Sequence, residues 1–213
     1  MRETPIIFNS EMVRACLDGR KTVTRRPIKP QPEASLSRLE NTDLWTYTLC
    51  EREWKCPYGQ PGDKLWVRET WATMRLHDSK APSLIQRSTD PRIWYMADSP
   101  PKWDTQCNPW PEGNMGKIRP SIHMPRWACR IVDDITNIRV ERLQEITRSD
   151  IKAEGLAVPK EYRSDDLEYN YRQWLPDEWK RLWDSLYTKK PEYQWNANPW
   201  VWVIEFVKPL ENE

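Results

Sequence analysis

The segment "GRKTVTRR", residues 19–26, combines groups that can do chemistry with groups that bind anions. Lys21, Thr22 and Thr24 stand among three arginines here. A threonine hydroxyl becomes a useful nucleophile only when a base takes its proton. A lysine acts as that base only when its pKa is lowered, as neighbouring cations would do. The segment is therefore a solvated surface turn, a grip on an anionic ligand, or part of an active site.

The elements around this segment would fix where its side chains point. The apolar run 4–8 predicts a first strand, and Asn9 or Ser10 then suits the cap of a helix. Gly19 stands where a left-handed residue often ends a helix, so the cationic run begins at a helix C-terminus. Beyond it, β-branched residues predict an extended segment that stops at Pro27. The apolar face of the helix is predicted at Met12, Val13, Cys16 and Leu17.

Further along the chain, short strands outnumber helices. Residues 27–44 are polar and contain three prolines, which predicts a loop. A short helix is predicted at 147–156, capped by Thr147 or Ser149 and ended by Gly155. Strands are predicted at 44–51, 64–69, 92–97 and 199–209, and as a pair across 126–143 with a turn at Asp133 and Asp134.

A stronger helix is predicted to open at Pro176 in its first turn. The order of elements predicts an α+β fold with a mostly antiparallel, barrel-like sheet and flanking helices. We expect one domain, residues 1–213, with a long Pro/Trp-rich insertion at about 76–125 that packs in order against the body. Core positions of the strong helix are predicted at Trp179, Leu182, Trp183 and Leu186. The tryptophans of the insertion include Trp94, Trp103 and Trp110.

The formal net charge is only +1, which excludes a protein that coats DNA without sequence preference. Basic residues nevertheless gather in residues 1–30 and again in 117–130. If the two segments meet in the fold, they form a positive patch that suits an anionic ligand or a nucleic-acid strand. The alternative is a solvated mosaic in which acids compensate these charges.

The composition also limits where the protein can be located in the cell and which kinds of catalysis it can perform. The sequence shows no run of about 20 apolar residues and no signal peptide, so we expect no membrane contact. Two distant histidines and no H-E-x-x-H motif argue against a metal enzyme, and we expect no metal and no cofactor. The five cysteines lack the spacing of zinc knuckles and are expected to be reduced thiols: Cys16, Cys50, Cys56, Cys107 and Cys129.

A second group of candidate residues lies in "PSIHMPRWACR", residues 120–130. His123, Arg126 and Trp127 on a loop stiffened by prolines would suit stacking on a base and gripping a phosphate. The alternative is a structural loop whose tryptophan belongs to the core. In "VRET", Arg68 and Glu69 either point into the same cleft or form an ion pair at the end of a strand.

The strand, the helix and the motif of Gly19, Lys21, Thr24 and Arg26 resemble the ASCH family of the PUA-like superfamily. The segment "PGDKLWVRETW" looks like that family's Gly-Asp turn and strand, "DIKAEGL" like its helix around Glu154, and "WVWVIEF" like its closing strand. The chain is similar above all to phage and prophage ASCH-domain proteins, in which "CPYGQPGD", "SIHMPRWA" and "NPWVWV" recur. The resemblance implies a PUA-like β-barrel, a cleft beside the first helix, and the cytoplasm of a bacterial host cell.

Some small bacterial ASCH proteins, with Thr at the fourth motif position, are amidohydrolases that act on acetylated cytidine nucleosides. Their catalytic Lys, Thr and Glu carry over onto Lys21, Thr24 and Glu154. Glu154 would orient the lysine or pass a proton to the leaving amine, unless it only ends its helix or pairs with an arginine. The side chains of Lys21 and Thr24 can meet only if the chain turns between them, because residues three apart on a strand point to opposite faces. Ligand-binding roles are expected at Arg20, Arg25 and Arg26.

Three functions remain open at this point, and we favour the first. The chain is a module that recognises nucleic acid or a modified nucleotide in a basic cleft beside the first helix. Alternatively, it is a hydrolase that acts on an acylated cytidine nucleoside or on RNA through Lys21, Thr24 and Glu154. The third reading is a phage accessory protein that binds a host protein through the insertion at 76–125.

Overall fold

The computed structural model describes most of the chain. Its described residues are 1–40, 42, 44–46, 52–85, 92–98, 114–156 and 168–209, with the side chains of 168–174 excepted. The predictions that fall on residues 47–51, Cys50, Trp103, Cys107 and Trp110 lie outside them.

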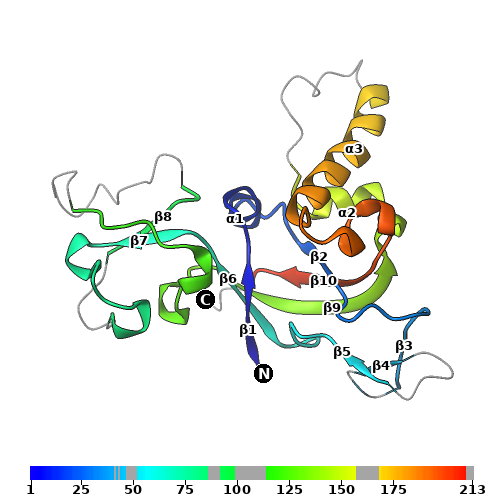
Figure 1. Ribbon diagram of the computed structural model, residues 1–213, viewed down its shortest axis with the longest axis horizontal. Helices are drawn as coiled ribbons and strands as arrows, with labels where there is room; N and C mark the ends of the chain where they lie inside the picture. Colours follow the sequence, from blue (N-terminus) through cyan, green and yellow to red (C-terminus); the bar gives the residue numbers. More distant parts are fainter. Residues whose placement is uncertain are drawn as a thin grey trace.

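A five-stranded sheet forms the centre of the molecule (Figure 1). Only β1 and β6 run parallel, so the predicted α+β fold with a mostly antiparallel sheet is confirmed. The outer strands β1 and β2 do not pair, and the described strands therefore form no closed barrel. The strands in spatial order are β1 (Glu3–Ile7), β6 (Lys64–Arg68), β9 (Val132–Arg142), β10 (Trp200–Val207) and β2 (Val23–Pro27).

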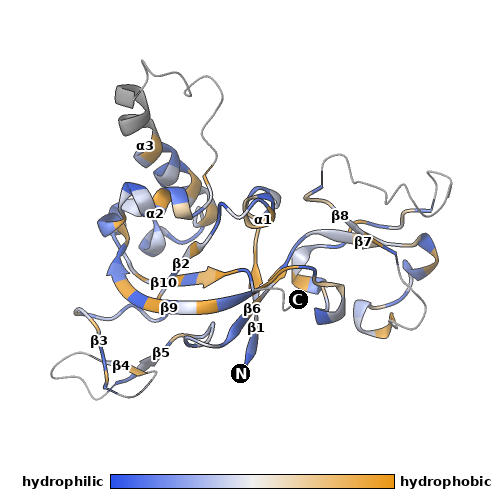
Figure 2. Ribbon diagram, turned by 180° about the vertical axis from the view of Figure 1, so that it is seen from behind, coloured by the Kyte–Doolittle hydropathy of each residue, from blue (hydrophilic) through white to orange (hydrophobic). Residues whose placement is uncertain are grey.

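Strand β10 is buried on both faces, as its continuous apolar sequence predicts. In Figure 2 it is among the most hydrophobic elements of the sheet. Val201 and Val203 pack on one side against the helices α2 (Arg148–Ala153) and α3 (Glu168–Leu186). The alternate residues pack on the opposite side, in a core that also contains residues of α1 (Ser10–Leu17); they are Trp200, Trp202, Ile204 and Phe206.

The two short helices begin and end where the sequence predicts. Asn9 caps α1 by accepting a hydrogen bond from the Met12 amide at 2.8 Å. Thr147 caps α2 in the same way through the Asp150 amide. The predicted apolar face of α1 is wrong at Leu17, which is 49% exposed because it lies in the last turn, beyond the core.

The long helix α3 differs from its prediction. Pro176 lies inside the helix instead of opening it, and the helix already begins at Glu168. Proline removes one backbone hydrogen bond from a helix interior. Leu175 and Trp179 on either side of it are buried in the same apolar cluster, and this packing holds the helix together across the proline. Trp183 is buried as predicted, whereas Leu186 at the end of the helix is 45% exposed.

The segment 126–143 also differs from its prediction. It contains the short 3₁₀ helix Arg126–Ala128 and then the single eleven-residue strand β9, so no turn occurs at Asp133 and Asp134. Pairing with β6 explains this, because Lys64 lies opposite Asp134 and bonds its carboxylate. Asp133 is buried instead, and burial together with the nearby Asp134 charge raises its pKa to about 6.

Two small sheets extend from the central one (Figure 1). The strand β3 (Ser37–Arg38) lies in the predicted loop 27–44 and pairs with β4 (Leu44–Thr46), which pairs with β5 (Trp54–Lys55). The strand β7 (Trp71–Thr73) pairs with β8 (Ile93–Tyr95), the strand predicted within 92–97. Among the described residues, the 3₁₀ helices are Arg75–His77, Pro82–Leu84, Ser121–His123, Arg126–Ala128, Leu143–Glu145, Pro191–Tyr193 and Trp195–Ala197.

The predicted insertion is ordered where it is described. The hairpin of β7 and β8 covers a small core of Trp71, Ile85, Met124 and Ala128. The single domain and the limits of the insertion stay predictions. No helix among the described residues is long and apolar enough to cross a membrane.

Candidate functional site

The end of α1 directs Lys21 toward α2. Gly19 takes a φ of +70°, which is the left-handed conformation expected there. The amides of Arg20 and Lys21 then both donate to the Ala15 carbonyl, at 2.8 and 3.0 Å. The chain therefore leaves the helix in a tight turn, and Lys21 forms an isolated β-bridge with Glu154.

Lys21 and Glu154, two residues that the family resemblance assigns to the catalytic set, form a buried ion pair. Lys21 Nζ lies 2.7 Å from Glu154 Oε2, and the two side chains are 0% and 2% exposed. Nζ also donates to the carbonyls of Glu154 and Val23, at 3.0 and 2.8 Å. Burial lowers the pKa of the Lys21 ammonium, while the Glu154 carboxylate acts to raise it. A lysine with a lowered pKa beside a carboxylate is typical of functional sites, although structural networks also produce it.

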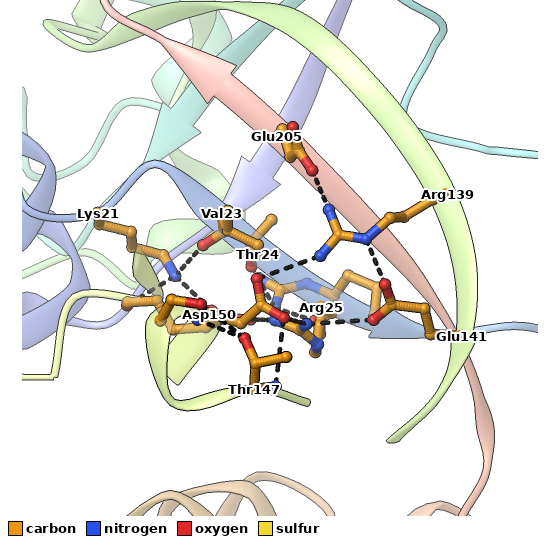
Figure 3. Close-up of polar contacts among 12 residues, drawn as sticks. Lys21, Val23, Thr24, Arg25, Arg139, Glu141, Thr147, Asp150 and Glu205 are labelled. Carbon is orange, nitrogen blue, oxygen red and sulfur yellow. Dashed lines mark hydrogen bonds and ion pairs between the residues drawn. The ribbon is translucent and has the colours of Figure 1, made fainter. Parts of the chain in front are cut away.

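Thr24 lies fully buried in β2, opposite Ile204 of β10. Its hydroxyl accepts a hydrogen bond from Arg26 Nη1 at 3.2 Å. The turn that we expected between Lys21 and Thr24 does not form, because pairing with β10 holds β2 extended. The lysine side chain folds back instead, so that its ammonium reaches the carbonyl of Val23 (Figure 3).

Phe8 connects Lys21 with Arg26. The Lys21 Nζ atom lies 5.1 Å from the centre of the Phe8 ring, and Arg26 Cζ lies 5.6 Å from it. The Arg26 charge also contributes to lowering the pKa of Lys21, after the larger effect of burial. Three of the residues that the motif singles out are thus close neighbours, together with Glu154 and an aromatic ring that sequence reasoning missed.

Arg25 points to the opposite face of β2, toward α2 and β9 (Figure 3). Its fully buried guanidinium lies 2.9 Å from Asp150, 3.3 Å from Glu141 and 3.5 Å from Glu154. Arg139 also bonds the carboxylates of Asp150 and Glu141. Arg25 is therefore enclosed by acids and holds β2 to its neighbours, rather than facing a ligand.

Arg20 lies at the surface on the other side of the Lys21–Glu154 pair. Its guanidinium donates to the Gly155 carbonyl at 2.7 Å and to the Asp18 carboxylate at 2.8 Å. Both of its contacts belong to helix ends, so the structure gives Arg20 a role in joining the end of α1 to the end of α2.

The second group of predicted residues forms separate contacts. Glu69 is buried and accepts two hydrogen bonds from Arg130, both at 2.9 Å. Burial raises the pKa of Glu69, and the Arg130 guanidinium opposes that shift. Arg126 forms a two-pronged ion pair with Glu3, at 2.7 and 3.1 Å. Two of the four basic residues of 117–130, Arg126 and Arg130, are thus paired with acids, in line with the mosaic alternative.

The remaining members of that group lie near the β7–β8 hairpin. Trp127 packs edge-on against the buried Trp71, with ring centres 5.9 Å apart, as expected of a core tryptophan. His123 is exposed in a 3₁₀ helix. Arg68 lies over the Trp66 ring, with Cζ 4.6 Å from its centre. No contact among the described residues joins these three side chains to the Lys21–Glu154 pair.

A cavity of about 380 Å³ lies beside α1, where the family resemblance implies a cleft. Its lining is more acidic than basic, so it is a poor match for an anionic ligand. The charged residues that line it are Glu11, Asp18, Glu154 and Glu178, against Arg14 and Arg20.

A second cavity, of about 250 Å³, has the opposite character, and we call it the Arg26 cavity. It lies between β2, β5 and the end of α3, and it contains no acidic residue. Arg26, which lines this cavity, lies over the same Phe8 ring as Lys21, so the cavity is near the Lys21–Glu154 pair. The lining residues are Arg26, Pro27, Lys29, Trp54, Lys55, Pro57, Tyr58, Tyr187 and Trp202.

Other predicted features are tested only in part. The described cysteines, Cys16, Cys56 and Cys129, are free thiols, and burial raises the pKa of Cys16 and of Cys56 to about 12. Within the part of the chain that the structure describes, no group of three His, Cys, Asp or Glu side chains could hold a metal ion. Much of the insertion that would bind a host protein, residues 99–113, lies outside the described residues.

Comparison with known proteins adds little to this geometry. No family model matches the chain. No curated protein matches it. The chain is similar to a solved structure, protein EF3133 from Enterococcus faecalis V583, described as a DUF984 protein. The alignment covers 100% of this chain and 85% of that chain, at 9% identity and a TM-score of 0.41. A likeness at that level carries no argument about this chain, whose resemblance to the ASCH family rests on the motifs quoted above.

Proposed function

We propose that this chain is an ASCH-like domain of the PUA-like type that recognises a nucleotide or a nucleic-acid strand. The observation that carries the proposal is the Arg26 cavity, where a motif arginine lines a hollow together with four aromatic residues. Aromatic faces stack on bases, and arginine contributes cation–π contacts and hydrogen bonds to the same ligands. The motif resemblance supplies the ligand class, and the cavity supplies a place for it.

The same proposal includes a PUA-like fold, in which the central sheet curves toward a barrel. Arg26 Nη2 donates to the Ile7 carbonyl at 3.0 Å, which bridges the outer strands β2 and β1 through a side chain. The bridge supports a PUA-like barrel that is completed by side chains between those two strands. Arg26 would then serve both the sheet and the ligand.

Binding should appear as a change in tryptophan fluorescence, because Trp54 and Trp202 line the cavity. We expect a shift when a short single-stranded RNA or DNA is added at low salt. Replacing Arg26→Gln should weaken that binding by about tenfold, as loss of one charged contact does. Arg181→Gln is the matched control, because Arg181 lies on the exposed surface of α3. Thermal unfolding checks that both variants fold, and no shift with RNA, DNA or nucleotides would refute the proposal.

A hydrolase is the second candidate, and the Lys21–Glu154 pair favours it. In that mechanism Lys21 takes the proton of the Thr24 hydroxyl, and the threonine oxygen attacks the amide carbonyl of the substrate. Water then hydrolyses the ester that this attack forms on Thr24. Glu154 orients the lysine and relays the proton that Lys21 has taken to the leaving amine. Three observations weigh against it: Thr24 is fully buried, the turn between Lys21 and Thr24 does not form, and Nζ already donates to Val23 and to the carbonyl and carboxylate of Glu154. Three acceptors around Nζ favour the ammonium over the free amine that a base must be, against the effect of burial, which lowers the pKa of Lys21.

The hydrolase reading predicts release of acetate from N4-acetylcytidine by the purified protein. Thr24→Val keeps the shape of this buried side chain and removes the hydroxyl, so activity should fall by more than about a hundredfold. Acetate and cytidine are measured by chromatography. Equal activity in the variant, or none in the original protein, would remove the catalytic role of Thr24.

A further inference from the structure

The lining of the Arg26 cavity is arranged from an apolar floor to a cationic rim. Trp54 and Trp202 are buried, at 6% and 2% exposure, and form the apolar part. Lys29 and Lys55 are exposed and line the same cavity from β2's end and from β5. A flat apolar group therefore fits the floor, while an anion is favoured at the rim.

Two tyrosines add hydrogen-bond donors to this cavity. The hydroxyls of Tyr58 and Tyr187 form no hydrogen bond with any other residue that the structure describes. Burial raises the pKa of Tyr187 to about 12, so its hydroxyl keeps its proton at neutral pH. A protonated hydroxyl donates to a carbonyl or phosphate oxygen of a ligand.

The inner end of the cavity is held in place by contacts that involve no ligand. Arg26 Nη1 donates to Thr24 Oγ1 at 3.2 Å and to the Arg25 carbonyl at 2.9 Å. Its Nη2 donates to the Ile7 carbonyl, which fixes the plane of the guanidinium. A guanidinium that is already held in place loses little conformational entropy when a ligand binds to it. Its planar donors suit hydrogen bonds to the polar edge of a base.

Charge separates this cavity from the one beside α1. The Arg26 cavity has three cationic residues and no carboxylate, whereas the other has four acidic residues and two arginines. A neutral nucleoside has no negative charge that the cationic side chains at the rim could attract. A phosphorylated ligand would be attracted to the Arg26 cavity and repelled by the acidic one.

We propose that the Arg26 cavity has a phosphate subsite at Lys29 and Lys55, and that its ligand is a nucleotide rather than a free nucleoside. The base lies on the floor of Trp54 and Trp202 with its polar edge toward Arg26, and the phosphate lies at the rim. This inference rests on the proposed function. The cavity volume of about 250 Å³ is below the range of about 300–1,000 Å³ for larger ligands, which suits one nucleobase.

The experiment compares pairs of ligands that differ only in phosphate. The four common ribonucleosides and their 5′-monophosphates are titrated into the protein, with affinity measured by calorimetry and tryptophan fluorescence. We expect at least one monophosphate to bind about tenfold or more tightly than its nucleoside at low salt. The double variant Lys29→Glu and Lys55→Glu should lose that difference. Lys117→Glu is the matched control, because Lys117 is an exposed lysine outside the cavity lining.

The outcomes separate the subsite from the proposed function. Loss of the phosphate preference in the double variant, with unchanged nucleoside affinity and an unaffected control, supports the subsite. Equal affinity for nucleoside and monophosphate overturns the subsite and leaves base recognition standing. Failure of every nucleoside, monophosphate and single-stranded oligonucleotide to bind overturns both.

Discussion

Glu154→Gln is expected to destabilise the protein by about 3–5 kcal/mol at neutral pH, the usual cost of removing one partner from a buried ion pair. The Lys21 ammonium lies 2.7 Å from this carboxylate, and the Arg25 guanidinium lies 3.5 Å from its other oxygen. Both cationic side chains are fully buried. The substitution thus removes the negative charge from between two cations that water cannot reach.

The partner substitution should cost less. In Lys21→Met the Glu154 carboxylate keeps its contact with Arg25, so no buried charge is left alone. The control is Glu3→Gln, which breaks an ion pair with Arg126 whose side chains are 41% and 43% exposed. Exposed pairs contribute about 0–1 kcal/mol. Urea unfolding followed by tryptophan fluorescence ranks the three variants, and a larger loss in Lys21→Met than in Glu154→Gln would contradict the argument.

The cost of Glu154→Gln should also depend on pH. Burial already lowers the pKa of Lys21 below the unfolded value of 10.5, and the substitution removes the carboxylate that opposes this shift. Between the lowered pKa and 10.5 the unfolded chain binds a proton that the folded chain does not. Stability of the variant therefore begins to rise at a lower pH than that of the original protein, and its deficit should shrink as the pH rises toward the Lys21 pKa of the original protein. A deficit that stays constant across this range would show that charge is not its cause.

Gly155→Ala is expected to be the second strongly destabilising change, by about 2–5 kcal/mol through backbone strain and overpacking. Gly155 has a φ of +88°, which residues with a side chain rarely adopt. An added Cβ would lie 2.6 Å from the Ala15 Cβ and 2.9 Å from the Lys21 Cβ. Both α1 and the segment after it would have to move away from α2, which would pull Lys21 from Glu154.

A second glycine separates strain from crowding. Gly62 has a similar φ of +91°, but a Cβ there would meet nothing within 4 Å. Gly62→Ala should therefore carry only the strain, about 1–3 kcal/mol. Thermal unfolding of both variants gives the difference. If Gly62→Ala is as damaging as Gly155→Ala, the close approach of α1 and α2 is not what requires glycine at 155.

The sequence predicted the elements that carry Lys21 and Glu154 because each residue stands beside a strong local signal, a left-handed glycine or a capped helix. It could not say which face of β2 each arginine would take. Once β2 pairs with β10, alternation places Thr24 and Arg26 on one face and Arg25 among acids on the other. That outcome depends on register, which no local pattern in residues 19–26 specifies.

The Arg26 cavity was missed for a related reason. Lys29, Lys55 and Tyr187 are far apart in sequence and belong to different elements, and none of them stands in a recognisable motif. Only the packing of β5 and the end of α3 against β2 brings them together. The turn predicted at Asp133 and the helix start predicted at Pro176 failed differently, because tertiary packing outweighed a local signal at each place.

The place of β10 in the sheet has a consequence for how the protein is made. β10 lies between β9 and β2, yet it follows both of them in the chain. Among the described strands it is the sole partner of β2, so residues 23–27 have nothing to pair with while the ribosome is still adding residues 200–207. The central sheet is therefore completed after nearly all of the described chain has been synthesised, and a nascent chain that stalls before Trp200 leaves the β2 part of the "GRKTVTRR" segment without its strand partner.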